Sequence, residues 1–219
     1  MVGQGKTGSN ERTVIPAIVG GALWIAYGIF EFLKPLGEGT GPYRPDLGYE
    51  LVADPLRYVI YGAAGGFALV LTALALIGHS TPGRGLVRLG RVLAYVAGAL
   101  GALALVGVIS QVVPLFFGSL VAGSLLLGLA TFAVGVATVG ARVATAQARL
   151  LVATGVLGIL TLPLRPLVYA VTVVPRVGGA MVIALFGIGW IGLGLIARHG
   201  WRSGTSEPPG DASGGHHVS

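Results

Sequence analysis

The fold is decided by residues 92–141, VLAYVAGALGALALVGVISQVVPLFFGSLVAGSLLLGLATFAVGVATVGA, which contain no Asp, Glu, Lys or Arg. A helix rises 1.5 Å per residue, so about 20 apolar residues cross the roughly 30 Å hydrocarbon core of a bilayer. This stretch is too long for one crossing and fits two. Gln111 to Pro114 interrupt it near the middle, where proline favours a helix end because it lacks a backbone donor. The stretch therefore predicts two membrane spans joined by a tight turn.

The rest of the chain repeats this pattern in further stretches without Asp, Glu, Lys or Arg, namely 13–30, 58–83, 150–164, 166–175 and 177–197. Their lengths predict an all-α, polytopic transmembrane helix bundle in one domain, 14–199. We place its six spans near 14–33, 56–78, 88–110, 117–140, 148–165 and 177–198. An outer loop is expected at 34–55, and flexible segments at 1–13 and 200–219.

Prolines mark the end of the fifth span and the start of the second. The fifth span is either a short helix of about 15 residues that stops at Pro163-Leu164-Arg165-Pro166, or a helix that runs to about 174 with a kink at these prolines. Both forms cross once. Asp54-Pro55 predicts the start of the second span, with Asp54 as the N-cap. Just before it, Leu47 to Ala53 are expected to form a short turn at the membrane interface.

Composition excludes a soluble globular protein. Of the 219 residues, 54% are hydrophobic and 10% are charged, whereas soluble domains carry about 25% charged residues. The chain therefore has too few charges to cover a water-facing surface. Cysteine is absent, which excludes thiol nucleophiles, zinc–thiolate sites and disulfides formed by this chain.

The remaining ionisable residues limit the chemistry further. No Asp or Glu occurs from residue 55 to residue 206, and the four histidines lie away from the centres of the predicted spans. Acid–base pairs, hard-cation sites and bis-histidine haem all require such groups within the bundle. We therefore expect no catalytic residue, no cofactor and no metal, and thus a protein that is not an enzyme.

The charge distribution predicts the orientation. With six spans, nine of the fourteen Lys and Arg residues and the whole formal charge of +6 lie on the side of the two termini. Lys and Arg near span ends favour the cytoplasm, so both termini are expected there, in a multi-pass protein of the cell membrane. Arg84, Arg88 and Arg91 share one helix face and are expected to contact anionic phospholipids. A partner protein at these arginines is the alternative. The basic pI is explained in this way without nucleic acid.

One acidic residue falls within an apolar span. Glu31 lies near the outer end of the first span and is expected to approach a cation, because an unpaired charge in a membrane is costly. The candidates are Lys34, Arg57 and Arg165. The structural interpretation is a salt bridge that fixes the first helix. The functional interpretation is an outward-facing substrate or proton site, flanked by Trp24, Tyr27, Gln111 and Arg165.

Aromatic and small residues predict how the helices lie. Aromatic residues are expected to anchor the membrane interfaces, namely Tyr58, Tyr61, Phe116, Phe117 and Tyr169 at the outer one and Trp201 at the inner one. Trp24 and Trp190 are expected to pack between helices. Small residues one turn apart, as in Gly62-x-x-x-Gly66, favour close helix packing.

No motif indicates a known family. We expect a non-catalytic accessory, scaffold or assembly subunit that acts through its helix faces and outer loop, with a membrane-protein partner or a second copy of itself. The alternative is a small solute or ion carrier or channel with a pathway near Glu31 and Arg165. A membrane-embedded lipid enzyme ranks third.

Overall fold

The computed structural model describes residues 7–33, 40–44, 49–52, 54–79, 85–140, 145–161 and 175–203. Within these residues there are six helices: α1 (Thr7–Leu33), α2 (Pro55–Gly78), α3 (Leu86–Ile109), α4 (Val113–Gly140), α5 (Thr145–Leu160) and α7 (Pro175–Ser203). Five of them are long and apolar enough to cross a membrane, and α5 is a shorter apolar helix. The expected helical fold class and membrane character are confirmed at this level.

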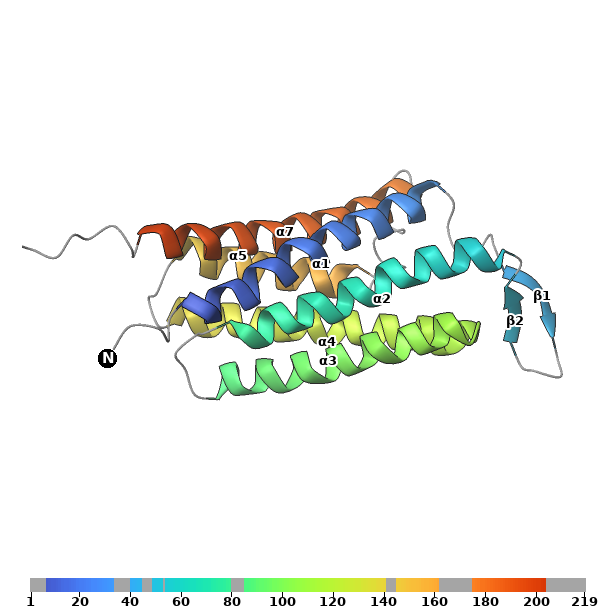
Figure 1. Cartoon of the computed structure of the whole chain (residues 1–219), viewed down its shortest axis with the longest axis horizontal. Coiled ribbons are helices and arrows are strands. Elements are labelled where there is room, and N and C mark those ends of the chain that lie inside the picture. Colours follow the sequence, from blue (N-terminus) through green and yellow to red (C-terminus); the bar gives the residue numbers. More distant parts are fainter. Residues whose placement is uncertain are drawn as a thin grey trace, which may run out of the picture.

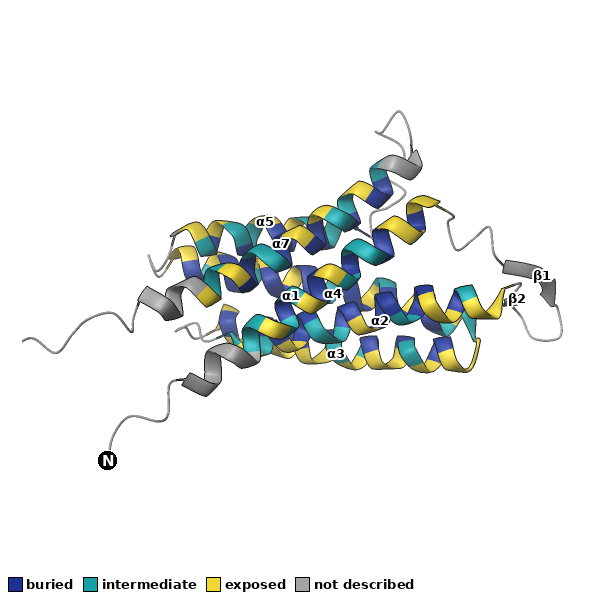
Figure 2. Ribbon diagram, turned by 45° about the horizontal axis from the view of Figure 1, so that its top comes forward, coloured by how far each residue is buried: buried dark blue, intermediate teal, exposed yellow. Residues whose placement is uncertain are grey.

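Successive helices run in alternating directions (Figure 1). The start of α1 and the end of α7 therefore lie at one end of the bundle, which we call the terminal end. The strands β1 (Thr40–Arg44) and β2 (Tyr49–Val52) lie at the other, which we call the hairpin end. Each long helix packs on its neighbours in sequence, and α1 packs along α7 to complete the bundle. Figure 2 shows buried residues as stripes along helices whose outer faces are exposed.

The helix bounds differ from the predicted spans at both ends of the bundle, and α4 begins at Val113 where the span was placed at 117–140. The helices α2 and α3 agree with the spans 56–78 and 88–110 to within two residues. By contrast, α1 begins at Thr7, inside the segment 1–13 that was expected to be flexible, and α7 continues to Ser203, into the predicted tail. A helix that is already nucleated extends at little cost, so it does not stop where the apolar residues stop.

The fifth helix ends earlier than its predicted span 148–165. It runs from Thr145 to Leu160. The prolines Pro163 and Pro166, at which the two alternative forms differ, lie outside the described residues.

The turn predicted between the third and fourth spans is confirmed. Gln111 adopts a φ of +56°, and its N–H donates to the Val108 carbonyl at 3.2 Å, while the Val112 N–H donates to Gly107 at 2.9 Å. This pair of bonds is a Schellman motif, which ends a helix and satisfies its last carbonyls. It lets α4 begin at Val113, and the α4 backbone lies close to Gly107.

The connection between α1 and α2 contains a β-hairpin. Strands β1 and β2 are antiparallel, with Tyr43 opposite Glu50 and Arg44 opposite Tyr49. The short turn expected over Leu47 to Ala53 is therefore wrong for 49–52, which form β2. Tyr and Val favour extended structure, and Pro42 of β1 is tolerated because both strands of a two-stranded ribbon are edge strands.

Candidate binding site at the hairpin end

A buried carboxylate lies at the hairpin end. Glu31, in the last turn of α1, is 2% exposed, and Tyr61 of α2 is 1% exposed. The Tyr61 hydroxyl donates a hydrogen bond to Oε2 of Glu31. Hydrogen bonds to a charged acceptor are stronger than those between neutral groups, so this bond offsets part of the cost of placing a carboxylate within an apolar helix.

Small residues position this pair. A Cβ on Gly65, one turn beyond Tyr61 on α2, would lie 2.9 Å from the Tyr27 ring. The glycine therefore leaves room for Tyr27, whose ring centroid lies 4.6 Å from that of Tyr61. Glu31 is one turn beyond Tyr27 on α1. The close packing of α1 on α2 at Gly65 therefore also brings Glu31 to the Tyr61 hydroxyl.

A pocket of about 320 Å³ opens beside this pair, between α1 and α2. It is lined by Phe30, Leu33, Asp54, Leu56, Arg57, Ile60 and Tyr61. Its walls are largely apolar, and its volume is in the range of small-molecule sites. Tyr61 belongs both to the wall and to the hydrogen bond with Glu31, so it connects the pocket with the buried carboxylate.

Charged groups at this site are arranged around the start of α2. The Asp54 carboxylate accepts a hydrogen bond from the backbone N–H of Arg57 at 3.1 Å, which caps the helix as predicted. Arg57 and Tyr61 are four residues apart and share a face of α2. Among the described side chains of the pocket and its wall, Glu31 and Asp54 are acidic and Arg57 is basic, so the formal charge is −1.

The predicted site residues have different outcomes. Trp24 and Tyr27 are fully buried beside the site, and Arg57 lines the pocket. Gln111 is exposed in the α3–α4 turn and is not a lining residue. Lys34 and Arg165 lie outside the described residues, so their approach to Glu31 remains a prediction.

Tyr61 was assigned a different role by the sequence. It was expected to anchor the membrane interface, together with Tyr58 and Phe116, and this was wrong because all three are buried in the bundle. The sequence did contain a feature that predicts the burial of Tyr61. Tyr61 lies four residues before Gly65, on the small-residue face of α2 that meets the other helices, and a tyrosine on that face turns inward.

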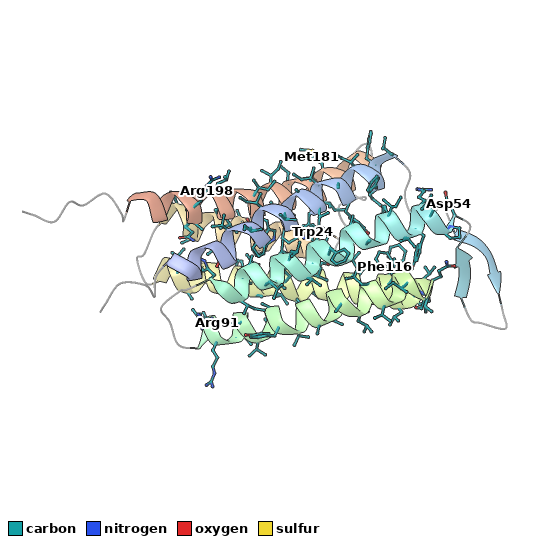
Figure 3. The ribbon with its side chains drawn as sticks, viewed as in Figure 1. Trp24, Asp54, Arg91, Phe116, Met181 and Arg198 are labelled. Carbon is teal, nitrogen blue, oxygen red and sulfur yellow. The ribbon has the colours of Figure 1, made fainter. Side chains whose placement is uncertain are left out.

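Aromatic rings connect the site to the middle of the bundle. From Tyr27 the row continues to Trp24 at 5.9 Å, to Phe186 of α7 at 5.3 Å and to Trp190 at 6.3 Å, measured between successive centroids. The Trp24 indole N–H donates to Oγ1 of Thr72 at 3.4 Å. Trp24 and Trp190 thus pack between helices, as expected, and Figure 3 shows Trp24 between the two ends of the bundle.

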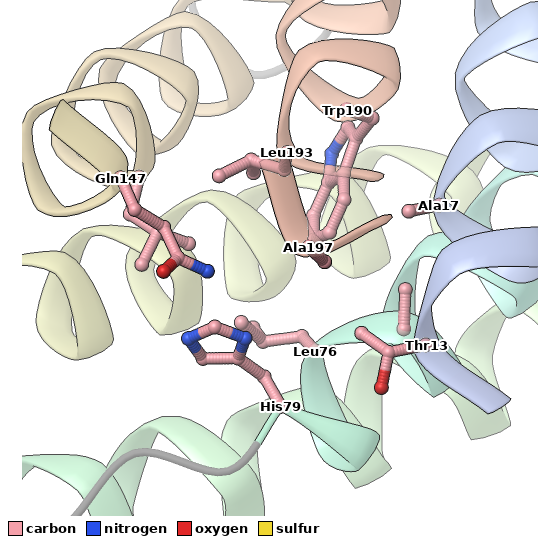
Figure 4. A pocket seen from close by; sticks show the side chains of 10 residues that line it. Thr13, Ala17, Leu76, His79, Gln147, Trp190, Leu193 and Ala197 are labelled. Atoms are coloured by element: carbon pink, nitrogen blue, oxygen red, sulfur yellow. The ribbon is translucent and has the colours of Figure 1, made fainter. Parts of the chain in front are cut away.

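A second, smaller cavity lies at the terminal end (Figure 4). It measures about 20 Å³, and its wall includes Thr13 of α1, His79 directly after α2, Gln147 of α5 and Trp190 of α7. A space of this size holds about one water molecule, so it is not a site for an organic ligand. Burial lowers the pKa of His79, and the nearby Arg91 guanidinium lowers it further. Arg91 also donates to the His79 carbonyl oxygen at 3.4 Å.

Basic side chains are exposed at the terminal end. Arg88 and Arg91 are exposed in the first turns of α3, and Figure 3 shows Arg91 extending away from the bundle. Arg84, the third member of the predicted set, lies outside the described residues. Whether these arginines contact anionic phospholipids stays a prediction.

The helices and the site define a class of protein, a multi-pass α-helical membrane protein with a carboxylate buried behind a small pocket. Comparison with protein-family models, with curated proteins and with solved structures finds no match to this chain. The function therefore has to be argued from the residues themselves.

Proposed function

We propose that the chain crosses the cell membrane six times, with its terminal end in the cytoplasm. The described side chains support this orientation. Arg88, Arg91, Arg149 and Arg198 belong to the ends of α3, α5 and α7 at the terminal end, whereas Glu31 and Asp54 lie with Arg57 at the hairpin end. Basic residues near span ends remain in the cytoplasm. The hairpin then lies outside the cell.

We further propose that the protein is a non-catalytic accessory, scaffold or assembly subunit. The observation that carries this proposal is the outer face of α3. Within the chain α3 packs on α2 and α4, and its opposite face presents a continuous row of exposed apolar residues, namely Leu89, Val92, Tyr95, Val96, Leu103, Val106 and Ile109. Tyr95, which is 61% exposed, is the aromatic residue in this row. A helix at the edge of a bundle is free to pack on a helix of a partner or of a second copy.

Unlike the exposed apolar residues of α3, the glycines lie where helices of the same chain meet. Gly66 of α2 faces Leu105 of α3, and Gly128 of α4 faces the backbone at Ile159 of α5. Because dispersion and close backbone approach drive helix association in lipid, we attribute the internal cohesion of the bundle to these contacts. The partner-binding surface is then the aliphatic face of α3.

Site-specific photo-crosslinking tests this role. A photoreactive residue at Tyr95 of α3 should capture a discrete protein in native membranes, identified by mass spectrometry. The matched control is Met181, which is 58% exposed on α7 and should capture lipid. Adducts with lipid alone at both Tyr95 and Leu103 would contradict the subunit role.

A second candidate is a small carrier or channel. It is favoured by the buried Glu31, because ionisable residues within membrane helices often bind substrates or ions. Under this proposal the pathway begins at the pocket beside Tyr61 and includes Arg165. Substrate flux into proteoliposomes, which contain no partner protein, distinguishes this candidate from the first.

A further inference from the structure

We propose that the cavity at the terminal end binds one ordered water molecule, which bridges the side chains of His79, Gln147 and Trp190. These side chains come from the residue directly after α2, from α5 and from α7. The site is distinct from the pocket beside Tyr61, and it requires neither transport nor a partner protein. It is therefore tested independently of both proposed functions.

The first argument is the size of the cavity. Its volume of about 20 Å³ exceeds the roughly 10–15 Å³ that one water molecule needs and is far below that of an organic ligand. Cavities lined only by apolar groups stay dry, whereas a cavity with two to four polar partners retains its water. The polar groups of the wall therefore decide what the cavity contains.

The second argument is the arrangement of His79 and Gln147. Figure 4 shows the His79 imidazole and the Gln147 amide pointing toward one another across the cavity. Within the described part of the chain, neither of these two side chains forms a hydrogen bond. Burial and the nearby Arg91 lower the pKa of His79, so at pH 7 the imidazole is neutral and has one nitrogen that donates and one that accepts. A water molecule can bond to either nitrogen and to the amide at the same time.

The backbone of His79 holds this side chain in place. Its N–H donates to the Leu76 carbonyl at 3.2 Å, and its carbonyl oxygen accepts from Arg91 at 3.4 Å. His79 is thus anchored on both sides, although it lies past the end of α2. The water therefore meets a partner whose position is already fixed.

The third argument is an unpaired donor in the wall. Trp190 is 2% exposed, and its Nε1 has no hydrogen-bond partner among the described residues. Leaving a buried donor unpaired is costly. The indole N–H of Trp24, by contrast, donates to Thr72. Since the Trp190 ring lines the cavity, the oxygen of a water molecule there supplies the missing acceptor.

The water adds links between helices to those made by packing. Packing joins α5 to α4 and α7, and it joins α2 to α1, α3 and α4. The bridge connects the end of α2 with α5 and α7. It thereby contributes to holding the terminal end of the bundle together.

Water contacts can be measured by NMR on the full-length protein in detergent micelles, with ¹⁵N-labelled tryptophan and glutamine. We expect nuclear Overhauser cross-peaks with a water that stays bound longer than the protein tumbles, at both the Trp190 indole N–H and the Gln147 amide. The matched controls are the Trp24 indole, which is bonded to Thr72, and the exposed Gln111 amide, and neither should show such a water. Cross-peaks at only one of the two cavity groups, or at neither, would overturn the bridge.

Two variants identify the source of these cross-peaks. Thr13 also lines the cavity, and a hydroxyl proton that exchanges with bulk solvent can relay a cross-peak. Thr13→Val removes this route and should leave both cross-peaks in place, so their loss would refute the bound water. His79→Phe removes a partner of the water and should abolish both cross-peaks. Their persistence in this variant would contradict the role of His79.

A cavity-filling variant keeps the test decisive if the His79 variant fails to fold. Ala197 lines the cavity, whereas Ala153 is exposed on α5 and does not. Ala197→Val displaces the water without replacing its hydrogen bonds, so its melting temperature should fall by roughly 2–4 °C more than that of Ala153→Val. Filling a dry cavity would stabilise the protein instead. A melting temperature of Ala197→Val equal to or above that of Ala153→Val would therefore overturn the proposal.

Discussion

Gly21 of α1 and Gly187 of α7 lie against each other's backbone, so that a Cβ on either residue would collide with the carbonyl oxygen of the other. The same register holds about two turns away in each direction, because Gly28 faces the backbone at Ala180 and Ala184, and Gly194 faces that at Val14. Antiparallel contact at this distance is open only to residues without a side chain. The α1–α7 interface therefore depends on glycine at matching positions.

Enlarging this contact should destabilise the bundle. Gly187→Ala should lower the free energy of unfolding by roughly 1–3 kcal/mol, because α1 and α7 must separate. The measurement is reversible unfolding in mixed detergent micelles. Gly118→Ala on α4 is the matched control, since a Cβ there meets nothing within 4 Å, and it should raise stability by about 0.5–1 kcal/mol through helix propensity. Similar losses in both variants would contradict this account of the interface.

The α3–α4 turn should tolerate glycine better than its natural residue. Gln111 has a φ of +56°, a conformation that costs a side-chain-bearing residue energy and glycine little. Gln111→Gly should therefore raise stability by up to about 1 kcal/mol, and Gln111→Val should lower it. Thermal unfolding of the two variants checks the order. A more stable valine variant would show that the turn is not left-handed at this residue.

Removing the Tyr61 hydroxyl should cost stability because it takes a donor from buried Glu31. Tyr61→Phe is expected to lower the free energy of unfolding by about 1–3 kcal/mol. Tyr95→Phe, at an exposed tyrosine, should change it little. A double-mutant cycle with Glu31→Gln isolates the coupling between the two side chains, and a coupling of zero would mean that the hydrogen bond contributes nothing.

Lowering the pH should reduce the stability of the folded protein through His79, which lies at the terminal end. Its pKa in the folded protein lies below the ordinary value of 6.5, so the unfolded chain binds more protons as the pH falls below about 6.5. Stability is thus expected to fall with pH from that value down to the folded pKa. The melting temperature of His79→Gln should depend less on pH between about 7.5 and 5. Arg91→Gln should also reduce this dependence, because Arg91 contributes to the lowered pKa. Equal slopes in the variants and the natural protein would exclude His79 as the cause.

The lengths of the segments without charged residues were sufficient to predict the helices. A helix that crosses a bilayer needs a minimum number of consecutive apolar residues, and few other structures need so many. The break at Gln111 to Pro114 and the cap at Asp54 were also readable, since each depends on local backbone chemistry. The extension of α1 to Thr7 could not be predicted, because hydropathy indicates which residues lie within the membrane but not where a helix ends.

The site was only half predictable. Glu31 stood out as a carboxylate in an apolar segment, but its bond to Tyr61 depends on how α1 and α2 are rotated against each other. That rotation is set by Gly65, which admits the Tyr27 ring, and so by a long-range packing event. The hairpin was missed for a related reason, because strand pairing between Tyr43 and Glu50 is not a property of either segment alone.

The row of rings from Tyr61 through Tyr27, Trp24 and Phe186 to Trp190 gives the protein a built-in optical probe. Only three tryptophans occur in the chain, and two of them belong to this row. When Tyr27 or Tyr61 absorbs light, its excitation energy is transferred to Trp24 over a few ångströms by resonance energy transfer. Emission from the interior of the bundle thus responds to changes beside Glu31 without any attached dye.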